Sequence, residues 1–135
     1  GEPNQVHYTA NVERGIDTSG VLTMDYTGFK AVSMAAKDCA APARCIIQGT
    51  KGYIQQKSTA NCCGGITFHP NEGKEEHYNL NGGRPREAAE FETFARAMES
   101  GDQELCTRMQ DTSIAVSRVL TVARRSAGIR FPGER

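Results

Sequence analysis

The residues with the clearest capacity for chemistry are five cysteines and three histidines. Thiolate sulfur and imidazole nitrogen are the ligands that zinc prefers, and the pair Cys62 and Cys63 lies close in sequence to His69 and His77. In a strand, however, successive side chains point to opposite faces, so adjacent cysteines seldom converge on one tetrahedral ion. We therefore predict no metal site, and interpret Cys62 and Cys63 as two small residues at a turn.

The remaining cysteines are Cys39, Cys45 and Cys106, and the odd total matches neither a secreted disulfide framework nor paired C-x-x-C motifs. Reduced thiols are expected. The N-terminus lacks the basic and apolar regions of a signal peptide, which together with reduced thiols predicts a cytoplasmic protein. The missing initiator Met indicates a piece cut from a longer polypeptide.

A second candidate for chemistry is the pair Arg84 and Arg86, in a glycine-rich approach to a predicted helix. Free backbone N–H groups at a helix start favour anions, and two guanidinium groups would add positive charge there. The alternative is an ordinary solvated loop.

Known catalytic motifs are missing from the sequence. It contains no G-x-G-x-x-G fingerprint, P-loop, H-E-x-x-H or G-x-S-x-G, and we interpret residues 49–52 as a hairpin turn. His7 lies in a predicted strand, whereas His69 and His77 are expected to oppose each other across the turn at residues 70–73. A cross-strand pair is the favoured interpretation, so no catalytic residue is assigned.

Composition limits the class of protein. A chain of 135 residues fits one domain with a core of its own, so residues 1–135 are interpreted as a single domain. Sixteen basic residues balance sixteen acidic ones, which argues against nucleic acid as a partner. The apolar runs are far too short to span a membrane.

The first two-thirds of the chain alternates between short strand patterns and turn formers. Residues 14–20 are predicted to be a loop. The predicted strands are residues 5–13, 21–27, 29–37, 43–48, 53–57, 65–69 and 74–80. Sequential hairpins of this kind indicate an open, mainly antiparallel sheet of six to seven strands.

Residue parity assigns the two faces of this sheet. One apolar face needs a cover, and is predicted to comprise Leu22, Met24, Tyr26, Val32, Met34, Cys45, Ile47, Ile54, Ile66, Phe68, Tyr78 and Leu80. The other face carries little charge, which is unusual for a surface that meets solvent. We predict that it contacts another protein through Val21, Thr23, Ala31, Ser33, Ile46, Gln48 and Tyr53, with Phe29 and Ala35 beside them.

After residue 85 the apolar period changes from two to about 3.6 residues, which predicts two helices within residues 86–127. The first carries the stripe Phe91, Phe94, Ala95 and Met98, and Met98 is interpreted as core packing. Asp102 is the predicted N-cap of the second, which Gly128 ends. The predicted fold is α+β, with both helices packed on one face of the open sheet.

Two stretches of sequence are similar to the Gfo/Idh/MocA family of glucose-fructose oxidoreductases, inositol dehydrogenases and dihydrodiol dehydrogenases. The first is residues 46–54, Ile-Ile-Gln-Gly-Thr-Lys-Gly-Tyr-Ile, which resembles the family's strand, Gly-Thr-x-Gly turn and returning strand. The second joins Glu90, Phe91 and Phe94 to the closing residues 125–132, Arg-Ser-Ala-Gly-Ile-Arg-Phe-Pro. The order and separation of these stretches fit the family over nearly the whole chain.

The resemblance implies the C-terminal domain of an enzyme whose N-terminal Rossmann domain binds NAD or NADP and is absent from this chain. The parent would transfer a hydride to or from a sugar-like polyol, carbonyl or diol. In the family the open sheet commonly forms a homodimer contact. The segment before the first helix approaches the substrate, which implies a substrate-side loop formed by Asn81, Arg84, Arg86 and Glu87.

Substrate closure and dimerisation are therefore the expected tasks of this domain. By itself the chain is expected to bind no cofactor and to be inactive. The alternative is a free-standing protein-binding or scaffold module that never had a nucleotide domain.

Overall fold

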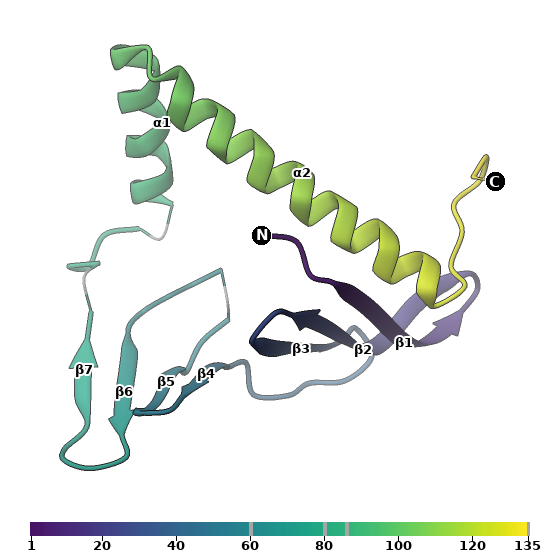
Figure 1. The fold of residues 1–135 in the computed structure, drawn as a ribbon, viewed down its shortest axis with the longest axis horizontal. Helices are drawn as coiled ribbons and strands as arrows, with labels where there is room; N and C mark the ends of the chain where they lie inside the picture. Colours follow the sequence, from purple (N-terminus) through teal and green to yellow (C-terminus); the bar gives the residue numbers. More distant parts are fainter. Residues whose placement is uncertain (60, 80, 86, 135) are drawn as a thin grey trace. The chain divides into compact units, whose positions relative to one another are not determined.

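The computed structural model describes residues 1–59, 61–79, 81–85 and 87–134. The described residues form seven strands followed by two helices, and the predicted α+β class with open antiparallel sheets is confirmed (Figure 1). The elements are β1 (Gln5–Glu13), β2 (Ile16–Tyr26), β3 (Phe29–Ala36), β4 (Cys45–Gly49), β5 (Gly52–Gln56), β6 (Ile66–Pro70), β7 (Glu76–Tyr78), α1 (Ala88–Ser100) and α2 (Gln103–Ser126).

The strands form two sheets instead of the single sheet expected from the meander. One has the order β1-β2-β3 and the other the order β4-β5-β6-β7. The segment between β3 and β4 contains Pro42, which has no N–H to donate to a ladder. The chain divides accordingly into two compact units, Gly1–Ala40 with Asp102–Arg135, and Ala41–Gly101. The interpretation of residues 1–135 as one domain stays a prediction.

The first hairpin is tighter than the predicted loop at residues 14–20. Glu13 pairs directly with Ile16, and the turn residues Arg14 and Gly15 both have positive φ, 52° and 82°. That geometry is the type I′ turn, whose twist matches the twist of antiparallel strands. Strand pairing therefore begins directly after the two-residue turn, and β2 starts five residues before the predicted position at Val21.

The second hairpin corrects the predicted faces of the first sheet. Tyr26 pairs with Phe29 across a two-residue turn, so every even-numbered residue of β2 lies opposite an odd-numbered residue of β3. Leu22 consequently pairs with Ser33, and Val21 pairs with Met34. The prediction that Leu22 and Met34 share a face is wrong, because it kept one parity through the turn.

Two faces of the first sheet can now be defined by register. The Leu22 face consists of Val6, Tyr8, Ala10, Leu22, Met24, Ala31, Ser33 and Ala35. The Val21 face consists of His7, Thr9, Val21, Thr23, Val32 and Met34. The predicted contact residues are thus split, since Val21 and Thr23 lie on one face and Ala31 and Ser33 on the other.

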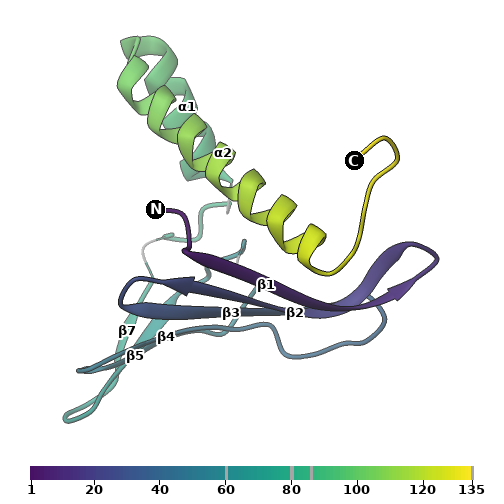
Figure 2. The same ribbon diagram turned by 45° about the vertical axis from the view of Figure 1, so that its right-hand side comes forward.

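Helix α2 covers the Leu22 face (Figure 2). The predicted N-cap is confirmed, because the Asp102 carboxylate accepts a hydrogen bond from the Leu105 N–H at 2.9 Å. At the other end the N–H groups of Gly128 and Ile129 bond to the carbonyls of Arg125 and Arg124, the two bonds of a Schellman motif. This turn brings Ile129 back into the core, where it is 8% exposed beside Ala123 at 5%.

The second unit contains the β4–β7 sheet and helix α1. Ile47, Ile54 and Phe68 form one apolar row across three of its strands. The predicted stripe of α1 is not buried, since Phe91 is 70% exposed and Met98 is 83% exposed. The interpretation of Met98 as core packing is therefore wrong. The predicted strand end Leu80 and helix start Arg86 lie outside the described residues.

Gly20 gives the first sheet its most specific packing requirement. A Cβ atom built at this position would lie only 2.4 Å from the ring of Tyr8 on the neighbouring strand. The absence of a side chain at Gly20 therefore allows the Tyr8 ring to lie flat across β2.

We predict that Gly20→Ala destabilises the protein by about 1–3 kcal/mol, because the added methyl group must displace the Tyr8 ring. Gly64→Ala is the matched control, since a Cβ there meets nothing within 4 Å. Urea denaturation followed by circular dichroism measures both. Equal unfolding midpoints for the two variants would show that Tyr8 moves aside without cost.

Candidate functional site

The predicted substrate-side loop lies in the second unit, between β7 and α1. Its backbone is a compact turn, in which the Arg84 N–H donates to the Asn81 carbonyl at 3.0 Å and the Ala88 N–H to the Pro85 carbonyl at 3.1 Å. Glu87 is the N-cap residue of α1. Of the four predicted residues the structure thus places Asn81, Arg84 and Glu87 in one short segment, whereas Arg86 lies outside the described residues.

The charge of Arg84 is partly compensated by a carboxylate on α1. Its guanidinium forms an ion pair with Glu92 on the second turn of α1, and both side chains remain at least half exposed. Surface pairs of this kind contribute little to stability, so Arg84 can exchange Glu92 for another hydrogen-bond acceptor at small cost. The loop therefore offers a positioned guanidinium that suits a hydroxyl-rich or anionic ligand.

Asn81 has a contact that sequence reasoning missed. Its side-chain amide donates to the carbonyl of Cys63, and its own N–H donates to the Asn79 side chain at 3.0 Å. These bonds hold Asn81, which belongs to the loop, against the β5–β6 connection. No local sequence pattern predicts a hydrogen bond to a backbone carbonyl eighteen residues away, because this contact depends on how the strands pair.

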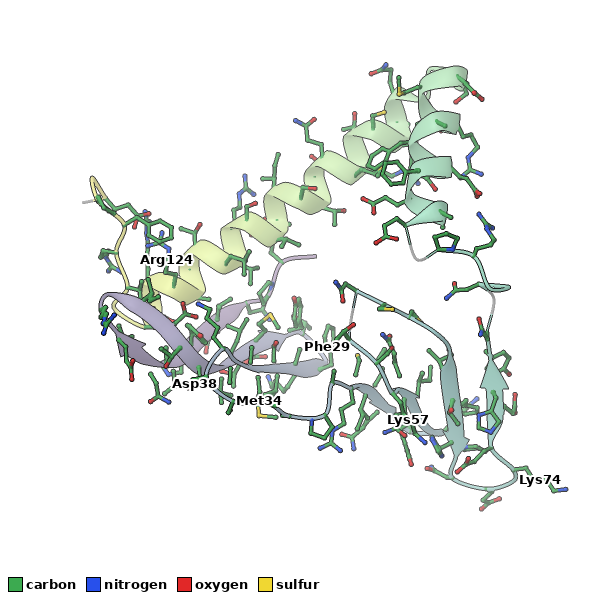
Figure 3. The ribbon with its side chains drawn as sticks, turned by 180° about the vertical axis from the view of Figure 1, so that it is seen from behind. Phe29, Met34, Asp38, Lys57, Lys74 and Arg124 are labelled. Carbon is green, nitrogen blue, oxygen red and sulfur yellow. The ribbon has the colours of Figure 1, made fainter. Side chains whose placement is uncertain are left out.

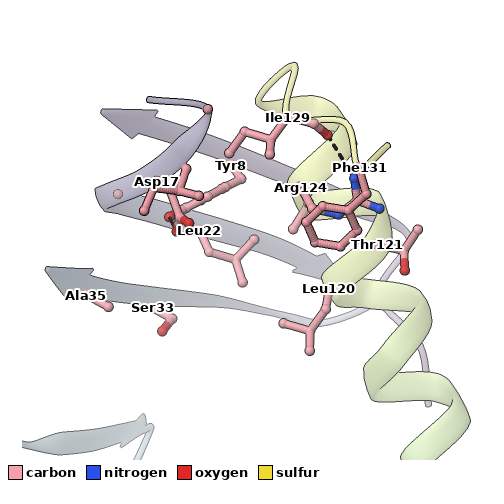
Figure 4. Close-up of a pocket in the computed structure, with 14 residues that line it drawn as sticks. Tyr8, Asp17, Leu22, Ser33, Ala35, Leu120, Thr121, Arg124, Ile129 and Phe131 are labelled. Carbon is pink, nitrogen blue, oxygen red and sulfur yellow. Dashed lines mark hydrogen bonds between the residues drawn. The ribbon is translucent and has the colours of Figure 1, made fainter. Parts of the chain in front are cut away.

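A cleft of about 520 Å³ lies in the first unit, between the Leu22 face and the end of α2 (Figure 4). Its walls are mainly apolar and include Ile16, Leu22, Ala35, Leu120, Ile129 and Phe131. The polar groups along it come from Tyr8, Asp17, Ser33, Thr121 and Arg124. The cleft was not predicted from the sequence, because the parity error had placed Ser33 and Ala35 on the other face of the sheet from Leu22.

Tyr8 and Asp17 form the polar centre of this cleft. The Tyr8 hydroxyl donates to an Asp17 carboxylate oxygen at 2.8 Å, and Lys37 Nζ approaches the other oxygen at 3.1 Å. Partial burial and this hydrogen bond raise the pKa of Tyr8. The bonds from Tyr8 and Lys37 lower the pKa of Asp17, so the carboxylate stays ionised as an acceptor.

The two histidines expected to oppose each other do not. His77 pairs with Thr67, and their side chains are 3.0 Å apart, whereas His69 stacks on Tyr53 with ring centroids 4.3 Å apart. His69 Nδ1 also lies 2.9 Å from Glu75. The predicted pairing of His69 with His77 is wrong by two residues, because the loop between β6 and β7 extends beyond residue 73. Among the described residues no cluster of three His, Cys, Asp or Glu side chains could hold a metal.

The predicted contact residues occupy separate surfaces. In the second unit Gln48 pairs with Tyr53 and Ile46 pairs with Gln55, so Ile46, Gln48 and Tyr53 do share a face. In the first unit the Val21 face is an exposed apolar surface, where Val32 is 61% exposed and Met34 is 75% exposed. Met34 lies on the side of the sheet away from α2 (Figure 3).

A strong ion pair closes the C-terminal segment onto α2. Arg124 binds both carboxylate oxygens of Glu134, at 2.6 Å and 2.5 Å, and its guanidinium lies 3.9 Å from the centroid of the Phe131 ring. The hydrogen bonds from Arg124, with a further one from the Phe131 N–H, lower the pKa of Glu134 from 4.5 to about 2. The ionised carboxylate is therefore favoured by the folded state.

This pKa predicts a dependence of stability on pH. A carboxyl group with a lowered folded-state pKa stabilises the protein above its ordinary pKa of 4.5, and that stabilisation is lost as the pH falls towards about 2. We expect Glu134→Gln to lower the urea midpoint at pH 7 and to flatten its decline between pH 4.5 and 2. The exposed Glu72→Gln is the control. Parallel profiles for wild type and Glu134→Gln would contradict the assignment.

Comparison with known proteins shows a distant similarity to an enzyme. No family model matches the chain. The chain is 25% identical over 120 residues to the scyllo-inositol 2-dehydrogenase (NADP(+)) IolU of Bacillus subtilis (strain 168). The match covers 89% of this chain but 36% of that enzyme, so the chain spans about a third of its relative's length. Neither described helix is long and apolar enough to cross a bilayer. The similarity supports the resemblance to the Gfo/Idh/MocA family at a distant level.

Proposed function

We propose that this chain is the C-terminal domain of a nicotinamide-dependent oxidoreductase that acts on a polyol or a sugar-like carbonyl compound. The observation that carries the proposal is the similarity to an NADP-dependent inositol dehydrogenase over 89% of the chain. The cofactor, NADP or NAD, would bind to an N-terminal nucleotide-binding domain of the same polypeptide. A cytoplasmic location stays a prediction.

The fold supports this proposal at the places where the resemblance lies. Residues 46–54 form the hairpin of β4 and β5, in which Gly49 pairs with Gly52. Residues 125–132 form the end of α2, the Schellman turn and the return of Ile129 into the core. Both stretches therefore have a structural role that a related domain would need to keep.

The first proposed task is contact with the substrate through the loop of Asn81, Arg84 and Glu87. Arg84 is exposed and held beside the start of α1 by Glu92, so its N–H donors can meet hydroxyl or carbonyl oxygens. A polyol offers several such oxygens at once. The bidentate geometry of a guanidinium suits neighbouring hydroxyl groups better than a single ammonium charge does.

The second proposed task is self-association through the Val21 face. Val21, Val32 and Met34 are exposed on it, and the charged side chains Asp25 and Lys30 at its edge pair with each other. An exposed apolar surface with neutralised charge is typical of a protein contact. We therefore propose a homodimer that uses this face, with Val32 and Met34 in place of the predicted Ala31 and Ser33.

The enzymatic proposal is tested in the parent polypeptide, with purified protein and NADP or NAD. We expect cofactor reduction with scyllo-inositol or a related polyol. Arg84→Ala should lower kcat/KM about tenfold, equivalent to about 1.4 kcal/mol, mainly by raising KM. Arg96→Ala, on the helix that follows the loop, is the control and should have no effect. An unchanged KM in Arg84→Ala would remove the loop from the substrate site.

The assembly is tested by light scattering. We expect a dimer for the unmodified protein and a monomer for the double variant Val21→Lys, Met34→Lys, because two lysines on each subunit repel across a symmetric contact. Val122→Lys, an exposed position on α2, is the control and should remain dimeric. A dimer that survives the double substitution would exclude the Val21 face.

A further inference from the structure

The β5–β6 connection holds the adjacent thiols of Cys62 and Cys63. Neither residue belongs to a strand, and both are exposed. The pleat that would direct neighbouring side chains to opposite faces is therefore absent at this pair. The side chains of Cys62 and Cys63 are therefore not held on opposite faces of a strand, as the sequence had led us to expect.

The backbone of Cys62 is held in a network of hydrogen bonds. Its N–H donates to the Thr59 carbonyl at 2.9 Å. Its carbonyl accepts from the Ser58 hydroxyl at 2.6 Å and from the Gly64 N–H at 3.0 Å. Any rotation of the peptide bond between the two cysteines must therefore break or rearrange this network.

The carbonyl of Cys63 joins the pair to the candidate loop. It accepts the hydrogen bond from the Asn81 side chain, and the Asn81 carbonyl accepts the N–H of Arg84 at 3.0 Å. A chain of three residues thus connects the backbone of an exposed cysteine to the backbone of Arg84, whose guanidinium is proposed to meet the substrate.

We propose that Cys62 and Cys63 form a reversible oxidation site, at which hydrogen peroxide closes a disulfide between neighbouring residues and loosens the Asn81 contact. The chemistry at the thiols does not depend on the function of the domain. Its regulatory consequence, a disordered substrate-side loop, rests on the function proposed above.

The reaction balances in two steps. One thiolate attacks a peroxide oxygen, which gives a sulfenic acid and, after protonation of the leaving hydroxide, water. The second thiolate attacks the sulfenic sulfur, a sulfur–sulfur bond forms, and the hydroxide that leaves is protonated to a second water. Overall the two thiols lose two protons and two electrons, and one peroxide is reduced to two waters.

Geometry makes this disulfide labile. Adjacent Cα atoms are about 3.8 Å apart, whereas disulfides usually join Cα atoms roughly 4.4–6.8 Å apart. A bond between neighbours is therefore strained and easy to reduce, as a reversible modification requires. Closing the ring rotates the intervening peptide, whose carbonyl is that of Cys62 and accepts the bonds from Ser58 and Gly64. We expect the next peptide, which carries the Cys63 carbonyl, to shift with it and to loosen the bond from Asn81.

Peptide mapping tests the chemistry directly. Trypsin releases both thiols in one peptide, residues 58–74, and separates Cys39, Cys45 and Cys106 into residues 38–44, 45–51 and 97–108. After brief exposure to dilute peroxide and alkylation, we expect peptide 58–74 to lose two hydrogens and to take up no alkylating reagent. Dithiothreitol should restore both alkylation sites. Preferential oxidation of the other three cysteines, or over-oxidation at Cys62 and Cys63 without a disulfide, would overturn the proposal.

Hydrogen exchange tests the coupling to the loop. We expect faster amide exchange in residues 79–85 after oxidation, no such change in oxidised Cys63→Ser, and the same increase in reduced Asn81→Ala. Cys106→Ser, an exposed cysteine in the other unit, is the control and should respond like the unmodified protein. A disulfide that forms without faster exchange would refute the coupling. Because neither readout involves catalysis, both results stand whether or not the parent is an oxidoreductase.

Discussion

The first unit depends on the burial of the Leu22 face beneath α2. A three-stranded sheet with one apolar face is stable in water when that face is covered, and α2 is the element that covers it. The contact is close because the buried helix residue is Ala123, and because the Tyr8 N–H donates to the Ser126 hydroxyl at 2.9 Å. The Schellman turn then returns Ile129 to the same core, so that the helix end and the strand are held together.

Turn geometry decides which side chains reach that core. A two-residue turn pairs Tyr26 with Phe29, and the resulting register directs Leu22 and Ser33 towards α2. Gly20 completes the arrangement by leaving room for the ring of Tyr8, whose hydroxyl in turn binds Asp17. One turn therefore determines both the composition of the cleft and the identity of the exposed face.

The proposed function uses the parts of the chain that its core leaves exposed. The Val21 face carries apolar side chains and a neutralised ion pair, which favours another protein surface over bulk water as its neighbour. In the second unit, Asn81 links the proposed substrate-side loop to the backbone of Cys63, one of two adjacent exposed cysteines. In the proposed oxidation site, regulation occurs through a hydrogen bond to the backbone and not through a catalytic side chain.

Local sequence patterns were sufficient for the element order, the α+β class and the ends of α2. Alternation, the Asp102 cap and Gly128 act within a few residues, and so they can be read without knowledge of distant contacts. The same holds for the stretches at residues 46–54 and 125–132 that resemble an oxidoreductase family.

Tertiary structure alone decided the division into two sheets, the faces of β2 and β3, the exposure of Met98 and the contact between Asn81 and Cys63. The physical reason is that strand register and helix burial depend on partners far away in the chain. A change of one residue at a turn reverses every side chain that follows it, and no local pattern records that change.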